Sequence, residues 1–155
     1  RKGTIDGLVE GGMGDDTLRG GDGDESLDGG QDEDVLNGGA GLDILTGGSQ
    51  ADRFVFGTLA SSSADIDDAD HITDFNLSQG DIIDLDGIDA NLARRGNQDF
   101  SYIGAKKFSD TSGELRYEAS GTDIHVMGDV DGDGDADFLI VLDDLTSLTR
   151  RAFDF

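Results

Sequence analysis

Acidic side chains recur at a fixed interval near the start of the sequence. Between Gly11 and Phe56, five nine-residue units follow one another, and each opens with two glycines. The sixth position is acidic in every unit and the eighth is apolar. Hard divalent cations such as calcium take six to eight oxygen ligands from carboxylates and main-chain carbonyls. The pattern therefore predicts a series of cation sites built around Asp16, Glu25, Asp34, Asp43 and Asp52.

The glycines and apolar residues indicate how the chain would position these carboxylates. Each unit divides into a six-residue turn and a three-residue strand, and glycine at positions one, two and four lets the turn adopt positive φ. Position eight lies in mid-strand, and its two neighbours point to the opposite face because side chains alternate. One turn and strand reverse the chain, so two units complete a coil. We therefore expect unit i to stack on unit i+2, as in a parallel β-roll.

Stacking places the apolar residues of position eight on two inner walls of the coil. A flexible linker rich in glycine and aspartate has no reason to keep an apolar residue in strict nine-residue phase, so the repeat favours a packed coil. One wall should hold Leu18, Leu36 and Phe54, and the other Leu27 and Leu45, with Val9 as an earlier member.

The same stacking brings acidic residues of alternate units together. Asp16 should lie near Asp34, Asp34 near Asp52, and Glu25 near Asp43. Bare carboxylates held that close repel one another, and calcium between the turns would remove the conflict. The longer arm of Glu25 is expected to weaken its site, and Asp32 and Gln50 must adopt positive φ where other units have glycine. The further predicted ligand positions, at positions two and four, are Gly12, Gly14, Gly21, Gly23, Gly30, Asp32, Gly39 and Gly41.

The overall charge narrows the range of partners. The 155 residues include 35 acidic and 11 basic side chains, for a net charge of −24. Such a chain cannot neutralise phosphates, so nucleic acid is excluded as a partner, and a bare anionic membrane is disfavoured. Because apolar residues make up only 35 % of the sequence, self-repulsion predicts an expanded chain when no cation is bound.

Three absences bear on where the protein works. The sequence has no cysteine, and bound metal can stabilise a small extracellular domain in place of disulfides. No apolar run reaches transmembrane length, and residues 1–3 lack the apolar stretch of a signal peptide. The chain does not begin with methionine, so we interpret it as a piece of a longer protein.

The nine-residue phase stops after Phe56, which suggests a boundary. We expect a roll over residues 1–56, in which residues 1–10 form a degenerate first unit with Gly3 and Val9 in phase. The second part would cover residues 57–155. Its first segment, residues 57–69, has no periodicity and is expected to be a solvated loop. The alternative is a cation site made by Asp65, Asp67, Asp68 and Asp70.

Short β patterns alternate with turns through the rest of the chain. The run 138–142 is apolar on both faces, so it should be a central strand, whereas strand 114–119 should be half exposed. A short helix is expected over residues 89–96, with Asp89 as its N-cap and Gly96 at its end, and a helical turn over residues 146–150. The expected strands are 71–75, 81–85, 100–103, 114–119, 123–127, 138–142 and 152–155.

A second acidic constellation lies in a loop near residue 130. Asp129, Asp131, Asp133, Gly134 and Asp137 occupy positions one, three, five, six and nine of this loop. The first four match the opening of an EF-hand, but position twelve is not the bidentate glutamate of that motif and the flanks are strands. We favour a calcium site between two strands, with Asp137 as the late ligand, over a solvated acidic turn.

Catalytic motifs are absent from the sequence. The two histidines, His71 and His125, do not have the His-Glu-x-x-His spacing of a zinc protease. His125 is expected on the exposed face of a strand, and the serines at 61–63 have no evident histidine and aspartate partners. We therefore expect a module that is not itself an enzyme, and this expectation does not extend to the longer parent protein, for which a secreted enzyme is one hypothesis.

The repeat follows the pattern Gly-Gly-x-Gly-x-Asp-x-apolar-x and resembles the RTX, or haemolysin-type calcium-binding, family. Four later segments are similar to the C-terminal domain of serralysin-type secreted metalloproteases: 70–75 (DHITDF), 80–85 (GDIIDL), 113–117 (GELRY) and 128–138 (GDVDGDGDADF). The resemblance implies an all-β fold, a parallel β-roll capped by a C-terminal antiparallel β portion with one or two short helices. It also implies several calcium ions, an extracellular location, and an ending at 152–155 of the kind presented to type I secretion machinery.

Two functions follow from this resemblance. The first is a secreted module that folds on extracellular calcium and supports type I secretion and the stability of an upstream domain. The second is a module that binds an extracellular glycan or cell surface, because the resemblance extends to modules of mannuronan epimerases. The net charge argues against an acidic sugar. The candidate residues for a local basic patch are Arg94, Arg95, Lys106 and Lys107.

Overall fold

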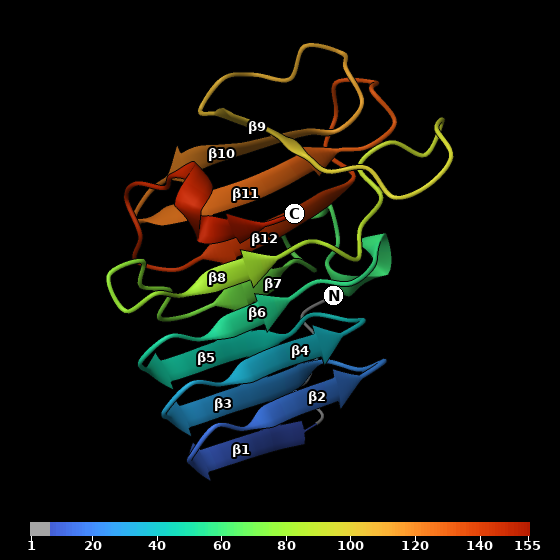
Figure 1. Cartoon of the computed structure of the whole chain (residues 1–155). Helices are drawn as coiled ribbons and strands as arrows, with labels where there is room; N and C mark the ends of the chain where they lie inside the picture. The colour runs from blue at the N-terminus through green and yellow to red at the C-terminus, as the bar shows by residue number, and fades with distance from the viewer. Residues whose placement is uncertain (1–6) are drawn as a thin grey trace.

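The computed structural model describes residues 7–155, and its first part is a stack of short parallel strands joined by tight turns. Figure 1 shows these strands as successive steps from blue to green. The parallel β-roll predicted from the repeat is confirmed. Three strands lie in each of two sheets: β1 (Gly7–Met13), β3 (Glu25–Gln31) and β5 (Ile44–Ser49) in one, and β2 (Thr17–Gly21), β4 (Val35–Gly39) and β6 (Arg53–Val55) in the other.

The register of the strands follows the predicted stacking of each unit on the unit after next. Every apolar residue of position eight is at most 7 % exposed. Gly3, the other residue expected to keep the phase, lies outside the described residues. The paired residues are Leu18, Leu36 and Phe54 on one wall and Val9, Leu27 and Leu45 on the other.

Apart from β6, the strands of the repeat are longer than the three residues expected for each unit. β3 has seven residues and β4 has five, because both continue into the two glycines that open the next unit. Gly21 pairs with Gly39 in the second sheet. A Cβ at Gly39 would strike the carbonyl oxygen of Gly21, so glycine lets successive main chains approach closely as well as turn.

The stack continues beyond the repeat. β7 (Asp70–Ile72) pairs in parallel with β5, and β8 (Ile82–Asp84) pairs in parallel with β6. Ile72 lies opposite Leu45 and Ile83 opposite Phe54, so both inner walls gain another member. The connections over residues 56–69 and 73–81 are longer than the turns of the repeat. The roll therefore has one more coil than the nine-residue phase indicates.

Above this last coil the first sheet changes from parallel to antiparallel pairing. β12 (Phe138–Leu142) pairs in parallel with β7 and antiparallel with β11 (Asp123–Asp129). β11 pairs antiparallel with β10 (Glu114–Ser120), and β10 pairs in parallel with the edge strand β9 (Ser101–Gly104). β13 (Phe153–Asp154) pairs with β8 and completes the second sheet. We name residues 100–155 the cap. The predicted antiparallel portion is confirmed, and β12 is central and wholly buried, as expected.

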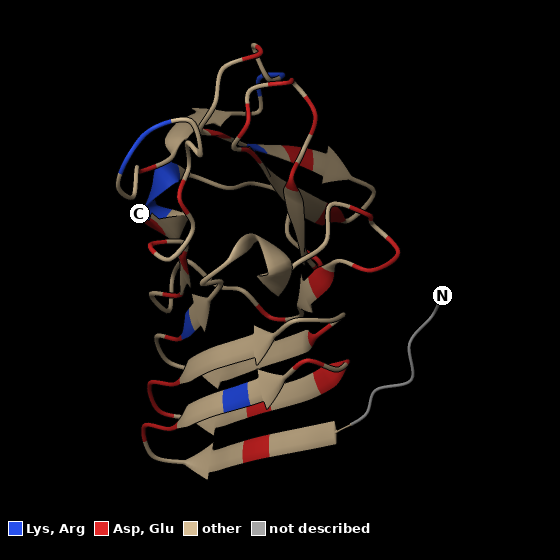
Figure 2. Cartoon of the chain, turned by 90° about the vertical axis from the view of Figure 1, so that its right-hand side faces the viewer, with Lys and Arg blue, Asp and Glu red and all other residues tan. Residues whose placement is uncertain are grey.

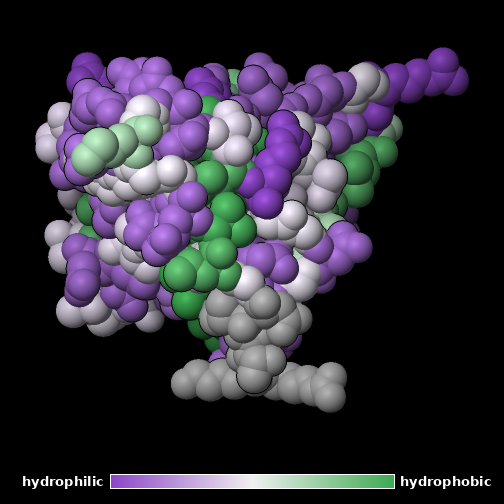
Figure 3. All heavy atoms as spheres, turned by 90° about the horizontal axis from the view of Figure 1, so that it is seen from below, coloured by the Kyte–Doolittle hydropathy of each residue, from purple (hydrophilic) through white to green (hydrophobic). Residues whose placement is uncertain are grey.

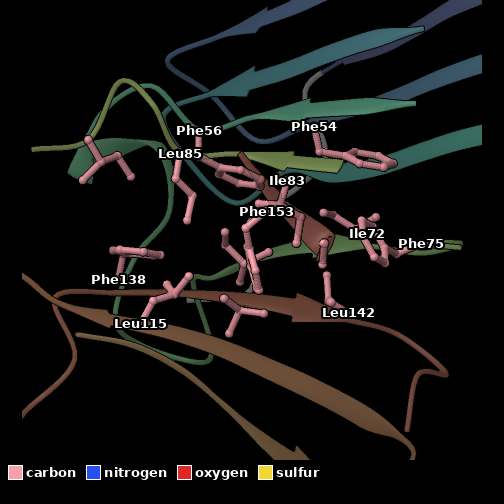
Figure 4. Close-up of a cluster of buried hydrophobic side chains, with 14 of the residues drawn as sticks. Phe54, Phe56, Ile72, Phe75, Ile83, Leu85, Leu115, Phe138, Leu142 and Phe153 are labelled. Carbon is pink, nitrogen blue, oxygen red and sulfur yellow. The ribbon is translucent and has the colours of Figure 1, made fainter. Parts of the chain in front are cut away.

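One hydrophobic core runs from the roll into the cap. Phe54 and Phe56 of the roll side and Leu115 and Phe138 of the cap belong to the same cluster of buried side chains. Figure 4 shows these residues pointing into a common space, together with residues of β7 and β8. The final segment joins this core through Phe153, which is 4 % exposed.

The predicted helices are wrong in place and type. Residues 89–96 form turns, because the carboxylate of Asp89 accepts hydrogen bonds from the main-chain N–H groups of Asn91 and Gln98 instead of capping a helix. The described helical segments are two 3-10 turns, η1 (Leu59–Ser61) and η2 (Arg150–Ala152). Neither resembles a membrane span, and no helix within residues 7–155 is both long and apolar enough to be one.

The lower end of the roll is an open edge. β1 and β2 are the outermost strands of their sheets within residues 7–155. Leu8 and Met13 on β1 are 64 % and 81 % exposed. Viewed from this end, hydrophobic surface forms a narrow band between hydrophilic flanks (Figure 3).

Candidate metal centre

Acidic residues stack along one turn-bearing side of the roll, and a second set stacks along the other side (Figure 2). The first row comprises Asp16, Asp34, Asp52 and Asp81, each just before a strand of the second sheet. At every step the main-chain N–H of the lower residue donates to Oδ1 of the residue above it. The N···O distances are 2.8 Å from Asp16 to Asp34, 3.0 Å from Asp34 to Asp52 and 3.1 Å from Asp52 to Asp81.

The second row comprises Glu25, Asp43 and Asp70 at the starts of strands of the first sheet. Glu25 donates its N–H to Asp43 Oδ1 and Asp43 donates its N–H to Asp70 Oδ1, both at 2.9 Å. The structure thus brings together all three acidic pairs named from the sequence.

The second carboxylate oxygen of most row members has no partner. Oδ2 is buried and accepts no hydrogen bond in Asp16, Asp34, Asp43, Asp52 and Asp70. No ion pair within the described residues includes any of these five carboxylates. A buried ionised carboxylate is costly unless a charge or hydrogen bond compensates it. The donor set therefore fits hard cations that bind oxygen.

Glycine at position one makes room for these unpartnered oxygens. A Cβ on Gly11 would lie 2.9 Å from Asp16 Oδ2 and 2.6 Å from the carbonyl oxygen of Gly29. Gly29 and Gly38 stand in the same relation to Asp34 and Asp43. None of these three glycines has positive φ. Their role is therefore space beside the carboxylate, and the prediction that position one needs positive φ is wrong.

Burial raises the pKa values of the row carboxylates. Burial lifts the pKa of Asp43 and of Asp52 to about 6, and neighbouring carboxylates add to the rise. The pKa of Asp70 rises to about 8, chiefly through burial. The pKa values of Asp34 and Asp81 are raised for the same leading reason. Near neutral pH these groups lack the compensating positive charge that would favour their ionised form.

The remaining predicted ligand positions follow the turns of the roll. Gly12, Gly30 and Gly39 at position two, and Gly14 and Gly41 at position four, have positive φ. Asp32 and Gln50 also adopt positive φ, at 80° each. Their side chains are joined, since Gln50 Nε2 donates to Asp32 Oδ1 at 2.7 Å. Asp32 Oδ2 accepts from the N–H of Gly14 at 3.1 Å.

The turn that carries Glu25 differs from the other turns. The longer side chain reaches back within its own unit, and Oε2 accepts the N–H of Gly21 at 2.8 Å. Gly21 and Gly23 do not have positive φ. Glu25 therefore stands in the row with its carboxylate already partnered in part.

Asp70 and Asp81 were missed as members of the rows. They stand 27 and 29 residues after Asp43 and Asp52, so the nine-residue phase does not extend to both. A signal was nevertheless present, because each begins an Asp-x-apolar triplet, ending in Ile72 and Ile83, like those of the repeat.

The second acidic constellation is assembled only in part. Asp129, Asp131 and Asp137, in the loop between β11 and β12, each offer a carboxylate oxygen, and these oxygens lie within 4.8 Å of one another. Asp133 stands apart from this group, with Oδ1 accepting the N–H of Asp135. Both oxygens of buried Asp129 accept main-chain N–H groups, from Gly132 and Gly134. These contacts agree with the predicted cation site and equally with an acidic turn whose carboxylates accept hydrogen bonds from its own main chain.

Neither histidine is a member of an acidic row, although His71 directly follows the row residue Asp70. His71 Nδ1 contacts Asp143 Oδ1 at 2.9 Å. His125 lies on β11 on the face opposite buried Ile124 and Val126, as the alternation predicts, but it is half-buried and not exposed.

Known proteins share this architecture. The family model described as "Peptidase M10 serralysin C terminal" matches residues 7–150. The solution structure of the AlgE6R2 subunit from the Azotobacter vinelandii mannuronan C5-epimerase is 25% identical, with a TM-score of 0.63 over 96% of this chain and 91% of that chain. The AlgE6R3 subunit of the same enzyme is 26% identical, with a TM-score of 0.51 over 98% and 84%. No curated protein matches the sequence significantly.

Proposed function

The chain belongs to the serralysin C-terminal family of peptidase M10 proteins, and from that premise we propose that it is a calcium-binding module that folds when calcium fills the spaces between its stacked turns. The observation that carries the proposal is the set of five buried Oδ2 atoms without partners, all on the two rows. Bound calcium would supply positive charge and accept oxygen ligands there. Oδ1 of five row carboxylates meanwhile accepts a main-chain N–H of the coil below and so holds that coil in register: Asp34, Asp52, Asp81, Asp43 and Asp70.

The expected energy of binding is large enough to decide folding. Calcium sites of extracellular modules typically have dissociation constants near 10⁻⁴ to 10⁻³ M. With a Kd of about 0.1 mM and calcium near 1 mM, each site contributes about 1.4 kcal/mol. The rows contain three and two steps, so five filled steps would contribute about 7 kcal/mol, similar to the whole stability of a small domain.

This dependence suits a protein that is exported unfolded and works outside the cell. In a low-calcium cytosol the chain, with its charge of −24, would stay expanded and could pass through a type I secretion channel. The ending 152–155 packs into the core once folded, where Phe153 contacts Tyr102. An exported chain would thus offer this ending to the secretion machinery before folding and then stabilise an upstream domain. In this proposal, residues 57–155 add the last coil and the cap to the repeats of residues 1–56.

The loop between β11 and β12 is a further calcium position in this proposal. Asp129, Asp131 and Asp137 would be its ligands. Asp133 lies outside this group of three. An Asp131→Asn variant should bind one calcium ion fewer while its roll still folds on calcium. An unchanged number of bound calcium ions would identify the loop as an acidic turn whose carboxylates are satisfied by its own main chain.

A calcium titration followed by circular dichroism tests the function directly. We expect an expanded chain in chelator and a cooperative gain of β structure as calcium approaches the millimolar range. Magnesium serves as the control cation, because it demands tighter octahedral geometry and gives up water reluctantly. A chain equally folded in chelator would refute the proposal.

A glycan-binding module is the second candidate, favoured by the likeness to subunits of a mannuronan C5-epimerase. Arg94 and Arg95 are exposed in the loop between β8 and β9, and Lys106 and Lys107 are exposed between β9 and β10. Titration with mannuronan oligosaccharides in saturating calcium should shift the NMR signals of these residues. Unchanged signals would remove this candidate and leave calcium-driven folding intact.

A further inference from the structure

A buried carboxylate stands where the roll meets the cap. Asp70 is the first residue of β7, which pairs with β5 of the roll on one edge and with β12 of the cap on the other. In the order of the eight-stranded sheet, β7 is the strand that joins the two parts. The main chain of Asp70 is therefore part of the junction itself.

Three contacts attach Asp70 to different parts of the molecule. Its Oδ1 accepts the N–H of Asp43 in the roll at 2.9 Å. Its own N–H donates to Ser62 Oγ at 2.9 Å. Ser62 Oγ in turn donates to the carbonyl oxygen of Leu139 in the cap at 2.6 Å. A disturbance at Asp70 would thus reach the roll, the loop 57–69 and the cap together.

The same residue retains an uncompensated oxygen. Asp70 is 1 % exposed and Asp43 is fully buried, and Oδ2 of each has no hydrogen-bond partner. Within residues 7–155, neither carboxylate forms an ion pair. The neighbouring His71 is engaged with Asp143. Two unpartnered carboxylate oxygens therefore lie on successive coils at the junction.

The upper end of the first row provides a contrast. Asp81 occupies the corresponding place there, but both of its oxygens are used. Oδ1 accepts the N–H of Asp52 at 3.1 Å, and Oδ2 accepts the N–H of Asn76 at 2.8 Å. The main chain therefore satisfies the last carboxylate of the first row, whereas the last carboxylate of the second row lacks such a donor.

We propose that a divalent cation bound between Asp43 and Asp70 joins the roll to the cap and makes the two parts fold as one unit. The proposal rests on calcium binding by the rows and assigns a particular task to one step of the second row. A hollow of about 350 Å³ adjoins this step through Leu42, which precedes Asp43, and through Ser62, the hydrogen-bond partner of Asp70.

The two tyrosines allow folding of the cap to be followed separately. Tyr102 on β9 and Tyr117 on β10 are the only tyrosines, and the sequence has no tryptophan. Their near-ultraviolet circular dichroism therefore reports on the cap. Protection of β3 and β5 amides from hydrogen exchange reports on the roll at each calcium concentration.

The test compares Asp70→Asn with Asp34→Asn, which removes a buried row carboxylate far from the cap. Wild type and Asp34→Asn should show both signals changing at one calcium concentration, although that concentration is higher for Asp34→Asn. In Asp70→Asn the cap signal should require several-fold more calcium than the roll signal, and one ion fewer should bind. Coincident signals and an unchanged ion count in Asp70→Asn would overturn the proposal.

If neither the roll nor the cap of Asp70→Asn folds, the wild-type chain tests whether a cation binds between Asp43 and Asp70. Crystals grown with Tb³⁺ should show an anomalous peak within coordination distance of Oδ2 of both Asp43 and Asp70. Peaks at other steps without one here would refute the junction site alone. A wild-type chain that folds in chelator and binds no calcium would instead refute the proposed function.

Discussion

The main-chain N–H of Asp34 donates a 3.0 Å hydrogen bond to Oδ1 of Asp52, while Oδ2 of Asp52 is buried without a partner. One oxygen of the carboxylate therefore fixes the register between two coils, and the other remains available to a ligand. Asparagine keeps the first function and loses the charge required for the second. Substitution can thus separate structural and ligand-binding contributions of the rows.

Asp52→Asn should weaken calcium-driven folding. The amide oxygen can still accept the N–H of Asp34, but the site loses its negative charge. With calcium near 1 mM, we expect a loss of about 1.4 kcal/mol in unfolding free energy, measured by urea denaturation. Asp22→Asn, at an exposed position, makes the same change in net charge and is the control. Equal stability of the two variants would contradict a ligand role for Asp52.

The response to pH should reverse when calcium is removed. Burial raises the pKa values of Asp43 and Asp52 to about 6 and that of Asp70 to about 8, from an ordinary value of 3.8. The folded, metal-free chain thus binds protons more tightly than the unfolded chain, so its stability should fall as pH rises from about 4 through 8. With calcium bound, acid should destabilise instead, because protons compete for the same oxygens.

The fraction of folded chain at pH 4.5 and pH 8, measured by circular dichroism in calcium and in calcium-depleted buffer, tests this reversal. Asp70→Asn is the control for general self-repulsion, since it lacks the group with the highest of these pKa values. It should flatten the metal-free dependence above pH 7. The same direction of pH dependence in both buffers would count against cation binding at the rows.

Gly29→Ala should destabilise the roll through steric conflict. Its Cβ would meet Asp34 Oδ2 and lie 2.6 Å from the carbonyl oxygen of Gly47. Overpacking of this kind typically costs about 1–3 kcal/mol, and the calcium midpoint of folding should rise as well. Gly57→Ala is the matched control, because nothing lies within 4 Å of a Cβ there and φ is not positive. Indistinguishable calcium titrations would refute the space requirement.

Arg53→Met should loosen the final strand. The guanidinium of Arg53 lies 2.7 Å from Asp84 and 2.9 Å from Asp154, and its side chain is 40 % exposed. Since solvent screens such pairs, we expect a loss of only about 1 kcal/mol and faster hydrogen exchange at β13. Arg19→Met removes an exposed arginine from β2 and should leave β13 unchanged. Equal exchange in both variants would show that the ion pairs do not hold this strand.

The sequence predicts the inner walls and the members of both acidic rows that lie within the repeat, because one local rule repeats. A period of nine residues with two units per coil places Leu18 beside Leu36 and Asp16 beside Asp34 without any knowledge of distant contacts. The role of glycine at position one could not be predicted in this way. It depends on where Asp Oδ2 lies after folding, which residue types alone do not reveal.

Long-range contacts explain what the sequence did not predict. The connection before Asp70 is long because Ser62 and its neighbours cover β12, with Ser62 bonded to Leu139. Asp89 looks like a helix cap locally, but Gln98, nine residues later, donates its N–H to the carboxylate. Both features depend on partners that the cap brings near, so counting from the repeat or from local propensity misses them.

Within residues 7–155 the outer edges of β1 and β2 have no partner strand, so further coils of the same repeat could stack there. Eighteen more residues of the same repeat would add one strand to each sheet and one carboxylate to each row, without altering the cap. Under the proposed function each added carboxylate would bring another ion into a single folding transition, so a longer roll should respond to calcium more steeply. The number of coils would then set how sharply the protein distinguishes the outside of the cell from the inside.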